Sequence, residues 1–451
     1  MSKIEVDAID KQSGSTLTLG GSGTAVNLAS GATQSGFGRT GTVDWITTVQ
    51  TSGFTAVNGK GYFVNTTSGG VAVALPAGSA GDIVAFKDYA NTWDSNAVTI
   101  TPNGSDKIGG TNASTTLTTE SQSVTLIFVD STKGWLDIHD STSKVEGASF
   151  ITATGGTITT VCTNYKVHTF TGPGTFTVCS IGNPAGSNTV SYMVVAGGGG
   201  GGGSVSGTNG GAGGGGAGGF REGRTPQCNT WSGSPLLCTT GCNAGLPVSV
   251  QAYPIAVGGG GGGNTADAGT SGVASTFSTI TSAGGGGAGA RSPADPGGNG
   301  SPGGSGGGAG HGTSGSPHPA GTGNTPPVSP PQGNPGDNFP SSPSGGGGGG
   351  GGATNPGSGQ NGGSGATSSI NGTPTARAGG GGGSSGPIAA GGTASGGGGA
   401  GAPNSPAGQG GTNGTTNTGG GGGASGNANG TPNLAGANGG SGIVMIRYRF
   451  Q

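Results

Sequence analysis

The chain has 451 residues, of which 116 are glycine, and only 7% of its residues are charged. Its formal net charge of −2 and the absence of lysine after Lys166 leave no basic surface for nucleic acid or for an anionic membrane. No segment approaches the roughly 18 apolar residues of a membrane span, and residues 1–7 lack the apolar region of a secretory signal, so we expect neither feature.

Residues 1–40 contain short strand-like pieces at 3–6, 15–19 and 24–28, separated by glycine and serine turns. These pieces are too short and too polar to bury a core within one chain. Intertwined homotrimers solve this problem by sharing a core around a threefold axis. The pattern therefore predicts a trimeric β stem or attachment segment over residues 1–40.

Residues 41–148 contain apolar runs bounded by turn sequences and show no helical period. The runs lie at 61–64, 71–75, 82–86, 97–100, 123–129 and 134–138. Their spacing predicts an antiparallel β-sandwich or jelly roll. His139 lies between Asp137 and Asp140, a trio that suggests acid–base chemistry, but solvation of a strand end explains it more simply. No nucleophile with an adjacent base is visible, so we do not expect an enzyme.

Residues 149–451 are predicted to form one domain bracketed by two apolar strands. The strand at 190–196 leads into the glycine run 197–203, and the strand at 442–450 follows the final glycine run. Further strands are expected at 150–153, 165–170 and 174–178, with the last two joined as a hairpin. We expect these strands to form a β base whose core contains the aromatic side chains Phe170, Phe176, Tyr192 and Tyr448.

The glycine runs between the bracketing strands have no side chains with which to build a core. Unequal inserts separate them, and they lack the strict Gly-X-Y period of collagen. The remaining ordered state is a bundle of left-handed threefold helices of the polyproline II type, in which bare backbones approach closely enough to pair their N–H and C=O groups. The predicted fold class is therefore all-β: a trimeric β stem, an antiparallel sandwich or jelly roll, and a β base with a polyglycine II helix sandwich.

The order of several motifs resembles the glycine-rich domain of tailed-bacteriophage tail-fibre proteins. The motifs are His168-Thr-Phe170, Gly174-Thr-Phe-Thr-Val178, Tyr192-Met-Val-Val-Ala196 with the glycines after it, Gly218-Gly-Phe-Arg-Glu-Gly223, Tyr253-Pro-Ile-Ala-Val-Gly258, and Gly439-Gly-Ser-Gly-Ile-Val-Met-Ile-Arg-Tyr448. The resemblance implies a polyglycine sandwich like that in the tip adhesins of T-even-type long tail fibres, where loops between helices contact the host receptor.

The front half resembles tail-fibre modules of marine phages. The similar segments are Met1-Ser-Lys-Ile-Glu-Val-Asp-Ala-Ile-Asp10, Ser13-Gly-Ser-Thr-Leu-Thr-Leu19, Tyr62-Phe-Val-Asn-Thr-Thr-Ser-Gly69, Gly81-Asp-Ile-Val84 and Lys133-Gly-Trp135. One departure from the T-even pattern is that the adhesin there is a separate protein capping a fibre. This chain instead fuses the stem, the β domain and the glycine domain.

The resemblance implies a receptor-binding adhesin of the virion tail fibre that recognises a host surface glycan or outer-membrane protein without catalysis. Its partners would be further copies in a homotrimer, and virion tail or baseplate proteins at the N-terminus. Two alternatives remain open. A purely structural fibre or decoration protein would have an insert-free glycine region, and an ice-binding protein would have regular Gly-X-X spacing with a flat Ala/Ser/Thr face. The unequal inserts favour the adhesin.

Candidate receptor contacts follow from counting the runs near 197, 213, 258, 284, 305, 345, 379, 396 and 419, which leave and return to the β base. The count places residues 204–212, 264–272, 291–304, 353–378 and 400–418 at the tip. The candidates there are Arg291, Asp295, Asn355, Asn361, Ile370 and Arg377. The count leaves Trp231 and Phe339 on the base side. These two remain candidates because aromatic side chains are common anchors of interfaces.

The cysteines and histidines give no convincing metal site, and we expect no metal or cofactor. Cys162 and Cys179 flank the predicted hairpin, but its register separates them. Cys228, Cys238 and Cys242 share one insert, where a disulfide can form on oxidation, and three thiols without a histidine are too few for a structural zinc. His311 and His318 are seven residues apart in a Pro/Gly-rich insert, where exposed loop polarity is the simpler interpretation.

Overall fold

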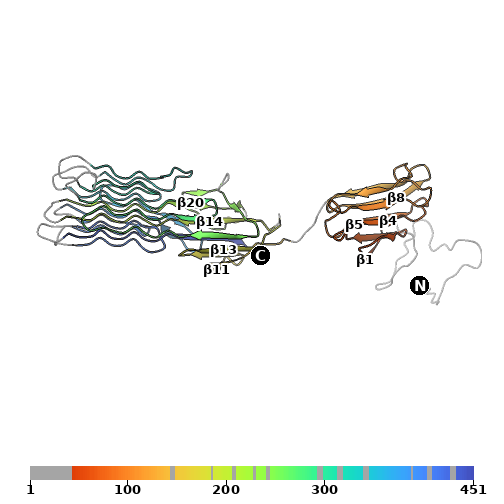
Figure 1. Ribbon diagram of the computed structural model, residues 1–451, viewed down its shortest axis with the longest axis horizontal. Coiled ribbons are helices and arrows are strands. Elements are labelled where there is room, and N and C mark those ends of the chain that lie inside the picture. The colour runs from red at the N-terminus through yellow and green to blue at the C-terminus, as the bar shows by residue number, and fades with distance from the viewer. Residues whose placement is uncertain are drawn as a thin grey trace, which may run out of the picture. The chain divides into compact units, whose positions relative to one another are not determined.

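The computed structural model describes residues 43–142, 148–183, 186–205, 210–226, 230–239, 244–291, 298–311, 318–338, 345–386, 390–403, 409–426 and 433–451 (Figure 1). The chain divides into two compact units, Met1–Glu146 and Gly147–Gln451. The predicted stem over residues 1–40 lies outside the described residues. Within the described ranges there is no α-helix and the secondary structure consists of β-strands, so the all-β prediction is confirmed. The same ranges contain no helix long and apolar enough to cross a membrane.

The first unit consists of two sheets that share one core. One sheet has the order β1 (Asp44–Gln50), β3 (Lys60–Val64), β5 (Ile83–Asp88), β8 (Ser123–Asp130) and β9 (Gly134–Ser141). The other has the order β2 (Phe54–Thr55), β4 (Val71–Ala74), β6 (Val98–Thr101) and β7 (Thr115–Leu117). Both sheets contribute alternate apolar side chains to a core that includes the fully buried Trp93 and Trp135.

The prediction that this unit is antiparallel is wrong. β1, β3 and β5 pair in parallel, as do β2, β4 and β6, and only the pairs made by β7, β8 and β9 are antiparallel. Successive strands from β1 to β6 alternate between the two sheets, so the chain winds as a coil and adds a parallel strand to each sheet in turn. A strand that is buried on one face shows the same alternation of apolar and polar residues in parallel and in antiparallel sheets. The sequence pattern alone therefore did not reveal the direction of pairing.

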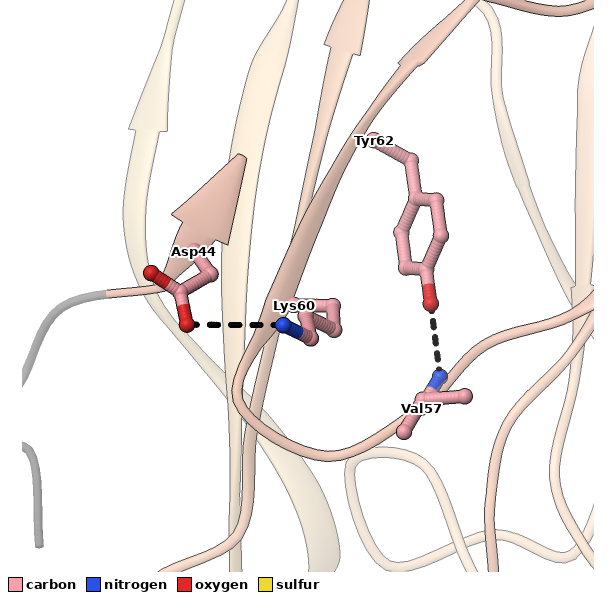
Figure 2. Close-up of polar contacts among 4 residues, drawn as sticks. All are labelled: Asp44, Val57, Lys60 and Tyr62. Carbon is pink, nitrogen blue, oxygen red and sulfur yellow. Dashed lines mark hydrogen bonds and ion pairs between the residues drawn. The ribbon is translucent and has the colours of Figure 1, made fainter. Parts of the chain in front are cut away.

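Two polar contacts lie near the start of the parallel strand β3 (Figure 2). Asp44 lies opposite Lys60 in the β1–β3 register, and its Oδ2 atom is 3.4 Å from the Lys60 ammonium. The Val57 amide donates a hydrogen bond of 2.9 Å to the Tyr62 hydroxyl. The ion pair is partly exposed, so its contribution to stability is small.

The second unit begins with two sheets, which together form the base. One sheet has the order β10 (Thr152–Thr154), β13 (Gly174–Ser180), β18 (Ala252–Ala256), β19 (Ser275–Phe277) and β20 (Ile280–Ser282). The other has the order β11 (Thr157–Val161), β12 (Tyr165–Phe170), β23 (Ile443–Arg449), β14 (Thr189–Val195), β15 (Phe220–Gly223) and β16 (Leu237–Cys238), and β17 (Leu246–Pro247) also pairs with β14. A separate hairpin joins β21 (Ala366–Ser368) to β22 (Thr375–Arg377).

The strands that bracket the glycine region lie side by side in the base. β14 and β23 pair antiparallel, from Ser191 opposite Arg447 to Val195 opposite Ile443. The predicted aromatic core is confirmed, because Phe170, Phe176, Tyr192 and Tyr448 belong to one buried cluster between the sheets. The chain therefore leaves the base and returns to it at neighbouring positions.

The predicted hairpin between residues 165–170 and 174–178 is wrong. β12 pairs with β11 and β23, whereas β13 pairs with β10 and β18, so the turn at Gly172 and Pro173 carries the chain from one sheet to the other. Cys162 consequently lies in the turn between β11 and β12, whereas Cys179 lies in β13 of the other sheet, and both are free and exposed. Phe170 and Phe176 are both buried in the shared core, one from each sheet. This burial stabilises the crossing between sheets, whereas a two-stranded hairpin would bury less apolar surface.

The glycine runs lie side by side beyond the strands of the base (Figure 1), and they form threefold helices that hydrogen bond to one another through their backbones. In the run 197–204 every third amide donates to the same neighbour, over N···O distances of 2.8–3.1 Å. The pairs are 197, 200 and 203 with 267–273, then 198, 201 and 204 with 434–440, then 199 and 202 with 213–216. A repeat of three residues is that of a polyproline II-type helix. Carbonyls of the same run accept amides from 285–291 and 422–425, so one helix contacts several others.

Glycine is a steric requirement at the interior of this bundle. A Cβ atom built on Gly198, Gly199 or Gly200 would fall within van der Waals contact of a backbone carbonyl in a neighbouring helix. Outer positions differ, because a Cβ on the exposed Gly259 would meet no atom within 4 Å. The backbone hydrogen bonds thus replace a side-chain core, but only where the neighbouring chains can approach this closely.

Candidate functional site

The threefold helices run between the base and a second end, here named the distal end. It is defined by described residues that flank the chain reversals there: Ser204, Gly210, Arg291, His311, Gly345, Ser384, Gly426 and Leu434. Ser204 makes β-bridges with Arg291 and Leu434, and Gly211 donates its amide to Gly345 while accepting that of His311. Inserts of different sequence begin and end at these residues, so the distal end gathers segments that are far apart in the chain.

Small hydroxyl side chains finish several helices at the distal end. The Ser204 hydroxyl donates to the carbonyl of Ser425 at 2.7 Å, and the Ala212 amide donates to the Ser384 hydroxyl at 2.8 Å. These serines are fully buried. They satisfy backbone groups at the helix ends without spreading the backbones apart.

Arg291 is a charged residue among these uncharged helix ends. Its amide donates to the carbonyl of Gly203 at 3.0 Å, which continues the hydrogen bonds between the two helices. Its side chain is only 4% exposed, and burial lowers the pKa of its guanidinium. Within the described part of the chain, the Nε and Nη1 atoms of Arg291 have no hydrogen-bond partner. Its bridge with Ser204 and its bond to Gly203 place Arg291 at the distal end, where the count of runs predicts it, and a receptor contact by this residue stays a prediction.

The ring of His311 lies close to the Arg291 guanidinium. A Cβ built on Gly210 would lie 2.7 Å from Arg291 Nη1 and 2.9 Å from His311 Nδ1, so both nitrogen atoms flank the Cα of Gly210. Sequence reasoning treated His311 as an ordinary loop residue and did not connect it to Arg291. A glycine at 210 leaves the space that these two side chains occupy.

The predicted tip position of residues 353–378 is wrong for Asn355, Ile370 and Arg377. The Asn355 carbonyl accepts the Gly352 amide near the base, and Ile370 packs with the sheet residues Met193 and Val195. Arg377 lies in β22, beside the same sheet. Asn361 ends a short hairpin that reaches along the side of the bundle, where its Oδ1 atom accepts the Thr393 amide at 2.9 Å.

The predicted site residues Asp295 and Phe339 lie outside the described residues. Residues 338 and 345, which flank the insert with Phe339, lie toward the distal end, and the predicted position of the insert itself falls outside the described residues. Trp231 lies on the base side, as the count of runs places it, and it is only 6% exposed. Whether any of these residues contacts a receptor remains a prediction.

The count of runs failed because several helices contain other residues besides glycine. Segments such as 298–304, 333–338, 409–418 and 434–440 are helices of the bundle, although none is an unbroken glycine run. Outer helices contact neighbours on one side only, so glycine is needed once per turn. The signal is Gly-X-X-Gly, as at Gly269 and Gly272, where a Cβ on either residue would meet the run 197–203.

A second group of buried polar residues lies on the base, under the inserts that carry Trp231 and Ile370. Arg447 donates to the Ile370 carbonyl and to the Thr230 hydroxyl, both at 2.9 Å, and its guanidinium stacks 4.7 Å from the ring centroid of Tyr165. The Ser234 amide donates to Glu222 at 2.8 Å, and burial raises the pKa of Glu222. These contacts fasten the two inserts to the sheet, so we assign the group a structural role.

The other candidates from the sequence have ordinary surroundings. Asp140 accepts hydrogen bonds of 3.0 and 3.1 Å from the Gln122 side chain at an exposed strand end. His318 Nδ1 lies 3.1 Å from Asn299 Oδ1. Cys238 is half-buried in β16, and Cys228 and Cys242 lie outside the described residues. In the described ranges, no three His, Cys, Asp or Glu side chains are grouped as metal ligands would be.

Comparison with known proteins agrees with the extent of the second unit. The model of the glycine-rich domain family matches residues 169–449, from β12 to β23, which is more than half of the chain. A search of curated proteins finds no match. The matched segment contains most of the base and the whole bundle of threefold helices, and the chain therefore belongs to the glycine-rich domain family.

Proposed function

We propose that the protein is a receptor-binding tail-fibre protein of a tailed bacteriophage, which attaches the virion to its host through the distal end of the glycine bundle. The observation that carries this proposal is the gathering of unequal inserts at the distal end, on a support whose helices are bonded through the backbone. A rigid scaffold that presents variable segments at one end is suited to recognition. The sequence resemblance to tail-fibre proteins supports the same function.

The proposed mechanism is non-enzymatic and multivalent. Distal inserts rich in Asn, Ser, Thr and Gly suit hydrogen bonding to a surface glycan or to an outer-membrane protein. A homotrimer assembled through residues 1–40 would present three distal ends, and the effective concentration of the second and third would raise the avidity far above that of one contact. The N-terminal segment would join the virion tail or baseplate.

The test is adsorption of the fluorescently labelled full chain to a panel of bacterial strains. We expect saturable binding to a subset of strains, and competition by the unlabelled protein. Replacing residues 339–344, which include the candidate Phe339, by a Gly/Ser segment of equal length should reduce binding. The matched control, Thr373→Ser with Pro374→Ser, changes an exposed turn on the base side and should leave binding unchanged.

Two outcomes would contradict the proposal. Adsorption that is absent from every strain, while the protein assembles into fibres, would favour a structural fibre or decoration protein. Equal loss of binding in the distal variant and in the base-side control would place recognition elsewhere. A thermal-hysteresis measurement separates the ice-binding alternative, for which the bundle should depress the freezing point.

A further inference from the structure

The side chain of Arg291 is not required by the fold around it. Its backbone amide makes the helix-to-helix hydrogen bond that any residue could make at this position. Other helices finish at the distal end with serine, as at Ser204, Ser384 and Ser425. Backbone hydrogen bonding therefore does not explain why a guanidinium lies at this helix end.

Burial of this guanidinium is unfavourable in the protein alone. Arg291 is 4% exposed, and among the described residues it has no ion pair and no partner for Nε or Nη1. A buried charge without a counter-charge or a full set of hydrogen bonds destabilises a folded protein. A buried polar group left unsatisfied in a native protein calls for an explanation, and a functional role such as binding an ion is one of them.

The geometry around Arg291 suits an anion. Its Nη1 atom and His311 Nδ1 lie together against Gly210, in the space that a Cβ would take, so two nitrogen-bearing side chains converge at this point. A guanidinium offers parallel N–H groups that match the two oxygens of a carboxylate or phosphate. Two described carboxylates lie toward the same end: the Asp267 carbonyl accepts the Gly203 amide and the Asp337 carbonyl accepts the Ala309 amide. Among the described residues neither forms an ion pair with Arg291, so the guanidinium keeps its positive charge for an external anion.

We propose that Arg291, with His311 and Gly210, forms a binding site for an anionic group, a carboxylate or phosphate, carried by a saccharide of the host surface. The site itself is independent of the protein's role, and only the source of the anion rests on the proposed function. Because the ligand compensates the buried charge, removal of Arg291 should weaken anion binding and should not destabilise the free protein. A purely structural arginine would show the opposite behaviour.

The first experiment follows the thermal unfolding of the purified full chain with glucuronate, with glucose 6-phosphate and with neutral glucose, at matched ionic strength. We expect one of the anionic sugars to raise the unfolding midpoint of the native chain by about 3 °C at ten times its Kd, and glucose to have no effect. Glucuronate and glucose 6-phosphate distinguish a carboxylate from a phosphate as the preferred group.

Variants assign this effect to the site. Arg291→Met should weaken binding of the anionic sugar at least about tenfold, because charge-assisted hydrogen bonds are lost, with an unliganded midpoint equal to or above the native value. Arg291→Lys should bind with intermediate affinity. Gly210→Ala places a methyl group against both side chains and should also weaken binding. Arg449→Gln, which removes an exposed charge on β23, is the control for net charge.

The inference is overturned if neither anionic sugar stabilises the native chain more than glucose, or if Arg291→Met lowers the unliganded midpoint and leaves binding intact. Cell adsorption separates this inference from the proposed function. Adsorption that is unchanged in Arg291→Met and Gly210→Ala would leave the receptor-binding function standing and would remove the anion site from it. Anion binding without adsorption to any strain would support the site and contradict the source that we assign to the anion.

Discussion

At the scale of single residues, the same amino acid has two different roles in the bundle. Interior glycines such as Gly214 are necessary because a Cβ would collide with the backbone of Gly381 and Gly382 in a neighbouring helix. The exposed Gly259 has open space where its Cβ would be. Composition alone does not separate these roles, because the difference depends on what lies beside each glycine.

This difference predicts opposite outcomes for one kind of substitution. Gly214→Ala should lower the free energy of unfolding by about 1–3 kcal/mol or more, because rigid backbone has to move aside. Gly259→Ala should be neutral, or should stabilise by up to about 1 kcal/mol through the lower entropy of the unfolded chain. Denaturant unfolding of the two variants measures both values. Equal destabilisation by the two would show that the bundle is less closely packed than its hydrogen bonds indicate.

His168 predicts how the stability of the base depends on pH. The ring is buried, with Nδ1 2.7 Å from the Gly155 carbonyl and Nε2 3.0 Å from the Tyr448 hydroxyl. Burial lowers the pKa of His168, nearby Lys166 lowers it further, and the Gly155 carbonyl partly offsets this shift. The native base therefore holds the neutral imidazole, whereas the unfolded chain takes up a proton below about pH 6.5.

The sign of the effect follows from this difference. The contribution of His168 to stability should be complete above the unfolded pKa and should decrease as the pH falls below about 6.5. Denaturant unfolding at pH 8.0 and 5.5 measures the loss. His168→Gln should reduce the difference between the two pH values, and an unchanged difference in that variant would assign the pH dependence to other groups.

At the scale of elements, some inserts pack against the base and form a second hydrophobic core with it. β14 and β23 have apolar side chains on both faces, and the inserts with Trp231 and Ile370 cover the face that points away from the other sheet. An insert between glycine runs is thus not always a presented loop. Its apolar residues decide whether it folds back onto a sheet.

The buried position of Ile370 gives a direct test of this assignment. Ile370→Ala should lower the free energy of unfolding by about 2–4 kcal/mol through the cavity that it leaves. Adsorption to cells should stay unchanged at temperatures where the variant is folded. Val273→Ala, at a position that is 60% exposed, is the matched control and should have little effect on stability. Loss of adsorption in a fully folded Ile370→Ala would restore this residue as a receptor contact.

At the scale of the whole molecule, the last strand of the chain completes a sheet that begins before the glycine region. β23 lies between β12 and β14 and pairs with both over most of its length. The bundle also joins segments far apart in sequence, such as 198–204 with 434–440. The second unit can therefore form its full set of contacts only when the complete chain is present.

This dependence predicts the result of a C-terminal truncation. Removal of residues 443–451 should abolish the thermal transition of the second unit, because β12 and β14 lose their common partner. The first unit has its own core and should retain its transition. The control removes only the exposed Gln451 and should preserve both transitions in calorimetry. A second unit that still melts cooperatively without β23 would contradict the proposed role of the strand.

The sequence by itself determined which kind of packing each segment could use. Residues 197–203 have no side chains, so they could order only through their own amides, and the apolar pattern of residues 190–196 and 443–449 predicted strands on either side. The aromatic residues of the base were identified as its core for the same reason. These features depend on local composition, which the sequence displays directly.

Only the tertiary structure decided which segments meet. The parallel winding of the first unit, the crossing at Gly172 between sheets and the base-side position of Ile370 all depend on contacts between distant residues. Helices such as 434–440 were missed because an outer helix needs glycine only where it faces a neighbour. For the same physical reason, the sequence did not reveal that Arg291 and His311 lie together beside Gly210. Three-dimensional packing decides which residues are neighbours in the bundle, and sequence spacing does not encode this packing.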